Sequence, residues 1–510
     1  MPDELEELLR RRALTEDAAR PDAVARRHER GGRTARENVA DLVDPGSFVE
    51  YGRFAIAAQR GRRELADLIA RTPADGLIAG TARVGGRPCA VLSYDYTVLA
   101  GTQGALGHRK KDRLFELIER MRLPTVFFAE GGGGRPGDTD HPVVSALDVR
   151  AFALWAGLSG LVPRIAIVKG NCFAGNAVIA GCADLIVATR DASIGMGGPA
   201  MIAGGGLGDF APEEIGPIEM QAPNGVVDVV AADEAEAVAV TKRLLGQFAG
   251  PGEPGEAADQ STLRGMVPER ERRAYKVAPI VETLADSGSV TFLRERYAPE
   301  MVTALARIEG RPVGVIANNT MAMAGAVTAG AADKAARFLQ LCDAFAIPVL
   351  SLVDTPGYMV GPKAEAEALV RRASRLLVAG AALRVPLIAV ILRRGYGLGA
   401  QAMVAGSLHE PVLTVAWPSA HLGPMGLEGA VRLGLRKELE AIADEQEREA
   451  RVREVTAAAQ ENARALNAAK LFEIDDVIDP AETRSLIAST LAAASGRQVA
   501  PRGHRFVDTW

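Results

Sequence analysis

The chain repeats one order of predicted secondary-structure elements. Residues 76–189 predict strand, helix, strand with a glycine loop, helix, strand, glycine turn, helix and strand, and residues 311–418 predict that order again. Between them, AGPGEPGEAADQST at residues 249–262 is rich in Gly, Pro and acidic residues, which is typical of a linker. We interpret the pattern as an internal duplication of one α/β domain, detected by element order rather than by letter identity.

The length agrees with this division, because 510 residues exceed what one compact core normally contains. We predict a first domain over residues 1–255, which opens with a charged helical segment over residues 1–45. The second domain is predicted over residues 263–510.

Composition narrows the class of protein. The chain is 48% apolar and 24% charged, as in ordinary soluble globular proteins, and its net charge of −5 argues against a nucleic-acid binder. The N-terminus has no apolar signal-peptide core, and no apolar run reaches the roughly 20 residues of a membrane span. We therefore expect a cytoplasmic protein without a membrane partner.

The cysteines give no sign of a metal site. Cys89, Cys172, Cys182 and Cys342 lie in apolar stretches without a CxxC pair, so we expect buried free thiols and no bound metal.

A basic stretch, RRHERGGRTARENV at residues 26–39, lies in the leading helical segment. It is typical of a solvated helix face, and contact with a partner or a phosphate is the alternative.

Two glycine-containing turns carry the candidate chemistry. KGNCFAGNAVIAGCAD at residues 169–184 and LRRGYGLGAQAMVAG at residues 392–406 each join a predicted buried strand to a predicted helix. Glycine lets backbone N–H groups approach a ligand closely, and such donors can stabilise an oxyanion. The candidate donors are the N–H groups of Ala174, Gly175 and Asn176 in the first turn, and of Gly397, Leu398 and Gly399 in the second.

Other interpretations of these turns are weaker. Neither turn has the GxxxxGK[ST] pattern of a phosphate loop, and GYGLGA lacks the spacing of a dinucleotide fingerprint. Tight helix–strand packing without catalysis remains an alternative for either turn alone. No histidine lies in a catalytic or metal-ligand pattern, so backbone donors without an obvious acid or base suit enolate chemistry on a thioester.

Several motifs resemble one family. DPGSF, DKAARF followed by CDAF and IP, DTPG, and AWPSAHLGPMG are similar, in that order, to stretches of the carboxyltransferase (β) subunits of biotin-dependent acyl-CoA carboxylases. The resemblance covers nearly the whole chain. It implies two tandem crotonase-like (ClpP/crotonase) ββα-superhelix domains and transfer of a carboxyl group from carboxybiotin to the α-carbon of an acyl-CoA.

The resemblance also implies roles for residues. The first turn would bind the thioester enolate and the second would hold the ureido oxygen of biotin. Further binding residues implied are, in the first half, Gly133, Gly134 and Arg135 of the loop AEGGGGR and, beside the biotin pocket, Gly325, Ala326, Asp354, Thr355, Pro356, Gly357 and Tyr358. Cations for the phosphates of coenzyme A could come from Arg109, Lys110, Lys111 and Arg135, although a solvated helix face explains HRKKDR equally well.

The family's partners are implied as well. The chain has neither an AMKM-type biotin attachment site nor an evident ATP-grasp segment, so carboxybiotin would come from a separate α-subunit with biotin carboxylase and biotin carboxyl carrier functions. The family assembles as a homo-hexamer with its active site between two subunits.

Departures from the family pattern leave alternatives open. Asn176 stands where a second Gly is usual, and residues 129–135 and 215–228 also differ. One alternative is the carboxyltransferase subunit of a biotin-dependent acyl-CoA decarboxylase. The other is a biotin-independent crotonase-type enzyme or a non-catalytic assembly subunit.

Overall fold

The computed structural model describes residues 2–135, 137–140, 148–271, 273–494 and 506–510. Its contacts divide into two compact units, residues 2–246 with 506–509, and residues 247–494 with 510. Along the sequence, the boundary between the two units lies between Gly246 and Gln247.

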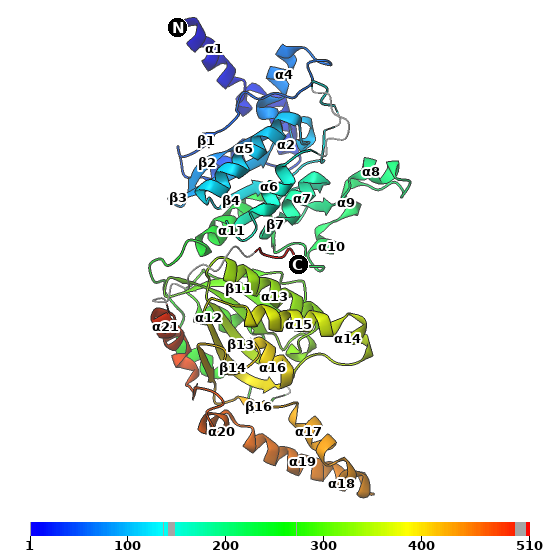
Figure 1. Cartoon of the computed structure of the whole chain (residues 1–510), viewed down its shortest axis with the longest axis vertical. Coiled ribbons are helices and arrows are strands. Elements are labelled where there is room, and N and C mark those ends of the chain that lie inside the picture. The colour runs from blue at the N-terminus through cyan, green and yellow to red at the C-terminus, as the bar shows by residue number, and fades with distance from the viewer. Residues whose placement is uncertain (1, 136, 141–147, 272, 495–505) are drawn as a thin grey trace. The chain divides into compact units, whose positions relative to one another are not determined.

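The first unit begins with helices and then forms its sheet (Figure 1). Its helices are α1 (Pro2–Ala13), α2 (Pro21–Glu29), α3 (Ala35–Leu42), α4 (Leu65–Arg71), α5 (Ala105–Met121), α6 (Ala151–Gly157), α7 (Gly175–Gly181), α8 (Pro199–Gly204), α9 (Pro212–Ile215), α10 (Ile218–Gln221) and α11 (Glu234–Gln247), with 3₁₀ turns η1 (Asp17–Ala19), η2 (Pro73–Gly76) and η3 (Leu99–Gly101). Its strands are β1 (Val49–Glu50), β2 (Leu77–Val84), β3 (Arg87–Tyr94), β4 (Thr125–Phe128), β5 (Arg164–Val168), β6 (Asn171–Phe173), β7 (Leu185–Thr189), β8 (Ser193–Gly195) and β9 (Val229–Ala231).

The first sheet has the strand order β1-β2-β3-β4-β5-β7-β9, and β6 pairs with β8 beside it. β2 and β3 form the predicted antiparallel hairpin, whose turn residues Gly85 and Gly86 have φ of 57° and 76°, as two-residue hairpins of this hand require. β4, β5 and β7 are parallel to their neighbours and buried at every residue, the pattern of strands covered on both faces.

The second unit repeats this architecture (Figure 1). Its helices are α12 (Ala278–Leu284), α13 (Ala329–Ala344), α14 (Pro362–Ala366), α15 (Leu369–Ala381), α16 (Gly397–Met403), α17 (Leu427–Gly434), α18 (Arg436–Ala441), α19 (Glu445–Asn462), α20 (Ala465–Lys470) and α21 (Thr483–Ala494), with 3₁₀ turns η4 (Gln260–Gly265), η5 (Met323–Gly325) and η6 (Pro480–Glu482). Its strands are β10 (Thr291–Leu293), β11 (Met301–Ile308), β12 (Arg311–Asn318), β13 (Val349–Thr355), β14 (Leu387–Tyr396), β15 (Leu413–Ala416), β16 (His421–Gly423) and β17 (Asp476–Val477).

The second sheet has the order β10-β11-β12-β13-β14-β15-β17, with β16 paired to β14. An antiparallel pair, β11 and β12, again precedes parallel strands. The predicted α/β class and the repeated element order are therefore confirmed.

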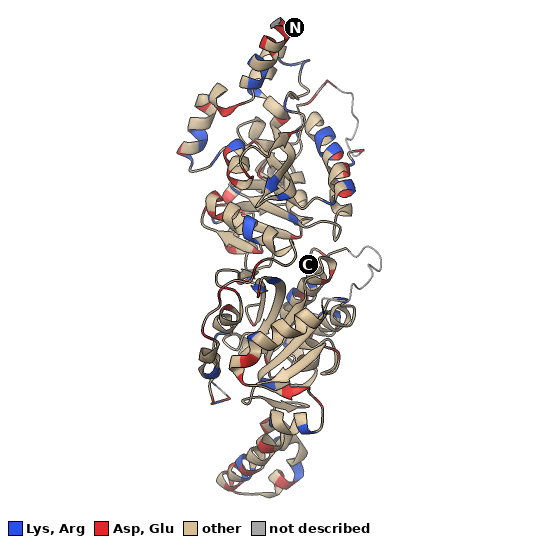
Figure 2. Cartoon of the chain, turned by 90° about the vertical axis from the view of Figure 1, so that its left-hand side faces the viewer, with Lys and Arg blue, Asp and Glu red and all other residues tan. Residues whose placement is uncertain are grey.

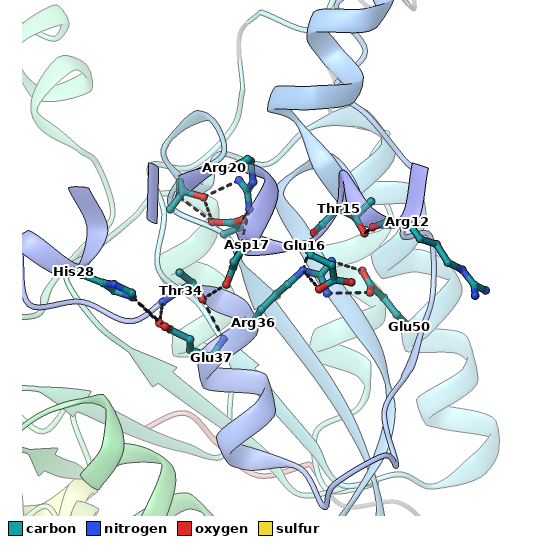
Figure 3. A network of polar contacts seen from close by, with 12 residues as sticks. Arg12, Thr15, Glu16, Asp17, Arg20, His28, Thr34, Arg36, Glu37 and Glu50 are labelled. Carbon is teal, nitrogen blue, oxygen red and sulfur yellow. Dashed lines mark hydrogen bonds and ion pairs between the residues drawn. The ribbon is translucent and has the colours of Figure 1, made fainter. Parts of the chain in front are cut away.

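The arginines of the leading helices anchor these helices to the sheet (Figure 3). Arg20 donates to Asp95 at 2.9 Å and to Thr97 at 2.8 Å, and Arg36 donates to both carboxylate oxygens of Glu50 at 3.2 and 3.3 Å. Arg27 forms a two-pronged ion pair with a buried carboxylate, as described below. The prediction of a solvated basic face is therefore wrong for Arg27 and Arg36.

The charges of the helices that follow β16 lie mostly at the surface. Along α17, α18 and α19, acidic and basic residues are interspersed (Figure 2), and Arg432 of α17 pairs with Glu449 of α19 at 2.8 Å. No helix in the described part of the chain has an apolar stretch long enough to cross a bilayer. All four cysteines are free thiols, as predicted, and only Cys182 is less than fully buried.

A buried ion pair beside the first core offers a test of this packing. Arg164 and Asp184 join β5 to the start of β7 through contacts of 2.9 and 3.3 Å, and the Arg164 guanidinium lies 5.2 Å from the ring centre of Trp155. Asp184→Asn leaves the arginine charge buried without a counter-charge, so we expect a loss of about 3–5 kcal/mol in unfolding free energy. Urea unfolding followed by tryptophan fluorescence, to which Trp155 contributes, measures the loss. Arg164→Met with Asp184→Leu serves as the matched control and should be less destabilised; an unchanged midpoint for Asp184→Asn contradicts the prediction.

Candidate active site

The two predicted turns occupy equivalent positions in the two units. Each follows the end of a strand, β6 in the first unit and β14 in the second, and each begins a seven-residue helix, α7 or α16. Ala174 has φ of 52° and Gly397 has φ of 60°. Ala174 therefore corresponds to Gly397, Gly175 to Leu398, and Asn176 to Gly399.

The loops facing the turns correspond as well. In the first unit the Gln103 N–H donates to the Gly133 carbonyl at 2.7 Å, and in the second the Val327 N–H donates to the Gly357 carbonyl at 3.0 Å. The bridges Gln103–Gly134 and Val327–Tyr358 continue both ladders. The glycine loop of the first unit and the DTPG loop of the second are thus the same structural element.

Not every predicted donor of the first turn is available. The Ala174 N–H donates to the Gly195 carbonyl at 3.1 Å, so the prediction that it could hold an oxyanion is wrong. The N–H groups of Gly175 and Asn176 begin α7, where a helix supplies no carbonyl, and they have no partner among the described residues. These two donors remain candidates.

The side chain of Asn176 lies inside the first unit and is fully buried. Its Oδ1 accepts hydrogen bonds from the Gly133 N–H and from Gln103 Nε2, both at 3.1 Å. Its Nδ2 donates to the carbonyls of Gly101 at 3.4 Å and Glu130 at 3.3 Å. The departure from glycine at this position therefore ties the helix to two loops rather than covering the turn with a side chain.

The glycine loop approaches the first turn closely. A Cβ on Gly133, which has φ of 89°, would lie 2.7 Å from the Ala174 Cβ, so only glycine fits there. Gly134 is exposed, and its N–H has no partner in the described part of the chain. The loop thus brings a third unpaired amide to the neighbourhood of Gly175 and Asn176.

The cations expected for coenzyme A mostly point inward. Arg135 forms a buried ion pair with Asp75 at 2.5 Å and also donates to Thr102, so its guanidinium is not free for a phosphate. Lys110 donates to the carbonyls of Ala74, at 3.0 Å, and Leu77, and burial lowers its pKa to about 8. These two residues have structural roles.

Lys111 and Arg109 complete this group of four. Lys111 is fully buried and donates to Gln103 Oε1 at 2.6 Å, whereas Arg109 is exposed. The sequence alone does not separate Arg109, Lys110 and Lys111 of HRKKDR, and it predicts one cationic group. The apolar positions Leu114, Phe115 and Ile118 of α5 share a helix face with Lys111, and that spacing is a signal for an inward lysine.

The second turn lies against the DTPG loop. A Cβ on Gly399 would lie 2.4 Å from the carbonyl carbon of Gly357 and 2.8 Å from the Tyr358 nitrogen. The N–H groups of Leu398, Gly399 and Tyr358 have no partner among the described residues. An open pocket of about 740 Å³ adjoins the turn and is lined by residues that include Gly397, Leu398, Gly423 and Pro424.

Asp354 holds this loop rather than facing a ligand. It is fully buried, and its carboxylate accepts hydrogen bonds from Arg393 Nε at 3.0 Å and from Arg394 Nε at 2.6 Å. Its carbonyl lies so near Gly325 that a Cβ there would be 2.6 Å away. Asp354 and Gly325 are therefore positioned next to each other, as predicted by their common region, but the carboxylate is not free for binding.

The rest of the loop is also internally bonded. The Thr355 hydroxyl donates to the Gly357 carbonyl and accepts from the Gly357 N–H, each at 3.1 Å. The Tyr358 hydroxyl donates to the Ala373 carbonyl at 3.3 Å, and burial raises its pKa to about 12. Ala326 is buried and Pro356 half-buried, so the backbone of the loop, and not its polar side chains, is what this element presents.

Comparison with known proteins gives the family. The model of the carboxyl transferase domain matches residues 26–506. The chain belongs to the carboxyl transferase domain family. The predicted resemblance, crotonase-like fold and enzyme class are therefore confirmed, and the chain is a carboxyltransferase of the kind found in biotin-dependent acyl-CoA carboxylases.

Two curated relatives cover almost the whole chain. The methylmalonyl-CoA carboxyltransferase 12S subunit of Propionibacterium freudenreichii subsp. shermanii is 34% identical over 98% of this chain and 96% of its own length. The beta4 subunit of a biotin-dependent long chain acyl-coenzyme A carboxylase from Mycobacterium tuberculosis is 32% identical over 98% of this chain and 95% of its own.

Two solved structures share the fold. A single-chain, multi-domain long-chain acyl-CoA carboxylase has a TM-score of 0.91 and 55% identity over 96% of this chain, which spans 48% of that enzyme's length. The transcarboxylase 12S hexamer with bound methylmalonyl-coenzyme A has a TM-score of 0.86 and 32% identity, and covers 100% of this chain and 98% of its own.

The strained residue at the first turn gives a second prediction. Ala174 has φ of 52° and ψ of −123°, a conformation that favours glycine. Ala174→Gly should therefore raise the unfolding free energy of the first unit by about 1 kcal/mol, after the greater freedom of glycine in the unfolded chain is subtracted. Thermal unfolding measures the change, and Ala177→Gly within α7 is the control that should destabilise by about 1 kcal/mol. A destabilised Ala174→Gly variant contradicts strain at this position.

Proposed function

We propose that this chain transfers a carboxyl group from carboxybiotin to the α-carbon of an acyl-CoA. The observation that carries the proposal is the pair of equivalent turns, each with unpaired amides on a helix start and on the facing loop. The relatives described above support it through their biotin-dependent and acyl-CoA names.

In this proposal the first turn binds the thioester. The N–H groups of Gly175, Asn176 and Gly134 donate to the thioester oxygen as the α-proton leaves and negative charge moves onto that oxygen. Each such donor typically contributes a few kcal/mol to the transition state, because it is already oriented before the reaction. The enolate carbon then accepts the carboxyl group as its bond to the biotin nitrogen breaks, and the α-proton ends on that nitrogen.

The second turn binds biotin in the same way. Biotin brings the carboxyl group and a ureido oxygen, and the N–H groups of Leu398, Gly399 and Tyr358 would hold that oxygen. The fit rests on the close contact of Gly399 with Gly357 and the Tyr358 nitrogen, where an added Cβ would have no room. The adjoining pocket provides an open approach for a group carried on another protein.

A matched pair of substitutions tests the two roles. At Gly175 a Cβ would lie 2.8 Å from Gln103 Nε2, and at Gly399 it would lie 2.4 Å from the backbone of Gly357. We expect Gly175→Val and Gly399→Val each to lower carboxyl transfer more than 100-fold. Acyl-CoA affinity should remain within about threefold of wild type only in Gly399→Val. Transfer is measured from malonyl-CoA, methylmalonyl-CoA and α-carboxylated palmitoyl-CoA to free biotin, and binding by calorimetry.

The controls separate chemistry from folding. Thermal unfolding identifies a variant that has lost its fold, and the milder Gly175→Ala and Gly399→Ala then replace it. Wild-type transfer by a folded Gly175→Val variant removes the first turn from the site, and wild-type transfer by a folded Gly399→Val variant removes the second.

We further propose that carboxybiotin is supplied by a separate α-subunit and that this chain forms a homo-hexamer core. The support is the 12S relative, whose structure is described as a hexamer assembly. Purification from the native host over streptavidin should retain the chain through a biotinylated partner, and sedimentation should give six copies. A chain that never co-purifies with a biotinylated protein contradicts the partner and favours a biotin-independent enzyme or an assembly subunit.

A further inference from the structure

A connected set of buried polar side chains lies behind the first turn and has no counterpart among the described residues of the second unit. Lys111 Nζ donates to Gln103 Oε1 at 2.6 Å, and Gln103 Nε2 donates to Asn176 Oδ1 at 3.1 Å. All three residues are buried, with Lys111 and Asn176 fully inaccessible. The set therefore runs from the middle of α5 to the first turn of α7.

The second unit builds the equivalent turn without this set, and there Asn318 supplies the buried amide to Gly325. The aligned ladders Gln103–Gly134 and Val327–Tyr358 place Val327 opposite Gln103 and, along the following helix, Ala335 opposite Lys111. Gly399 corresponds to Asn176. An apolar residue, an alanine and a glycine thus build the same turn, loop and helix without any of the three polar side chains.

The positions equivalent to Lys111 and Gln103 are Ala335 and Val327, so the burial of these two polar side chains calls for another reason. Lys111 forms no ion pair in the described part of the chain and lies 5.7 Å from the ring centres of Tyr94 and Phe152. Burial lowers its pKa to about 7, while the carboxylates of Asp112 and Asp75 oppose that shift. A lysine held in this way is costly to the fold, and such groups are typical of functional sites.

We propose that Lys111, Gln103 and Asn176 form a positioning relay that sets the Gly175–Asn176 amides against the Gly134 loop for the thioester enolate. In its protonated form Lys111 fixes which way the Gln103 amide points, because an ammonium can only donate. Gln103 must then present its NH₂ group to Asn176, and Asn176 in turn accepts from the Gly133 N–H. The relay acts on the thioester side only, and the inference rests on the proposed function.

Backbone contacts make the relay relevant to the donors. The main chain of Gln103 also holds the loop. Its N–H donates to the Gly133 carbonyl, and its carbonyl accepts a hydrogen bond from the Arg135 N–H at 3.1 Å. A Cβ on Gly175 would lie 2.8 Å from Gln103 Nε2. One residue therefore contacts both sides of the candidate oxyanion site, and a rotation of its amide would move them relative to each other.

The test uses a substitution that preserves shape. Gln103→Glu keeps the contact with Lys111 but removes the donor to Asn176, since the ionised carboxylate beside an ammonium can only accept. We expect kcat for carboxyl transfer to fall at least 10-fold, with KM for the acyl-CoA changed less than threefold, because the loss arises in the transition state. Lys111→Met should lower kcat in the same way. The double variant, Gln103→Glu with Lys111→Met, should be no slower than the slower of the two single variants, because both substitutions break the same relay.

Two further variants keep the test decisive. Asn176→Gly removes the acceptor of the relay, and replaces Gln103→Glu if that variant fails to fold. Arg113→Met removes an exposed cation from the same helix and should leave kcat unchanged. A merely structural role would lower thermal stability while leaving kcat within twofold of wild type, and that result overturns the relay.

The outcome is separable from that of the proposed function. If wild type transfers carboxyl groups and Gly175→Val does not, a Gln103→Glu variant of wild-type kcat refutes the relay alone. If wild type transfers no carboxyl group between free biotin and any of the three thioesters although it binds one of them, the proposed function itself fails.

Discussion

Each unit depends on a close main-chain contact between a strand-to-helix turn and the glycine loop that ends the neighbouring strand. In the second unit this contact joins Gly399 to Gly357, and in the first it joins Ala174 to Gly133, at separations that one additional Cβ would disrupt. Parallel strands bring such turns and loops together, because their carboxyl ends meet at one edge of the sheet. The amides of Gly175, Asn176, Leu398 and Gly399, which start the helices, are then without partners in the described structure and lie beside a second backbone segment.

The loops are short of apolar residues, and buried ion pairs hold them instead. Arg27 forms an ion pair with Glu130, with contacts of 2.8 and 2.6 Å, just before the first loop. Arg393 and Arg394 both form ion pairs with Asp354 at the start of the second loop. Burying such a pair costs desolvation energy, and removing one partner strongly destabilises the fold. These pairs therefore favour one loop conformation more than they add net stability. Arg135 and Asp75 serve the same purpose at the far end of the first loop. Polar residues that look like ligands in the sequence are thus largely used to position backbone donors.

Sequence reasoning reached the repeated α/β order, because hydrophobic periodicity and glycine turns are local signals. It also located both turns, since a buried strand, a glycine and a helix follow one another within a few residues. It could not assign individual donors: the Ala174 amide is occupied by Gly195, which is brought back by a separate strand. Nor could it see that Arg135 pairs with Asp75, which lies 60 residues earlier in the chain. Long-range pairing decides whether a charged side chain is available, and that information is not local.

The two units also solve one packing requirement with different residues. Both have a 3₁₀ turn whose last glycine, Gly101 or Gly325, has a positive φ and a carbonyl that accepts a buried amide. In the second unit that amide belongs to Asn318 at the end of β12, and in the first it belongs to Asn176 in the turn itself. Because Asn318, at the end of a strand, donates this hydrogen bond, position 399 can remain glycine and pack directly on the DTPG loop. In the first unit the corresponding strand position is Tyr94, an aromatic core residue, so the amide must come from the turn. The asparagine that departs from the family pattern is therefore compensation for a strand-end residue, and it makes the geometry of the first turn dependent on side chains in a way that the second turn is not.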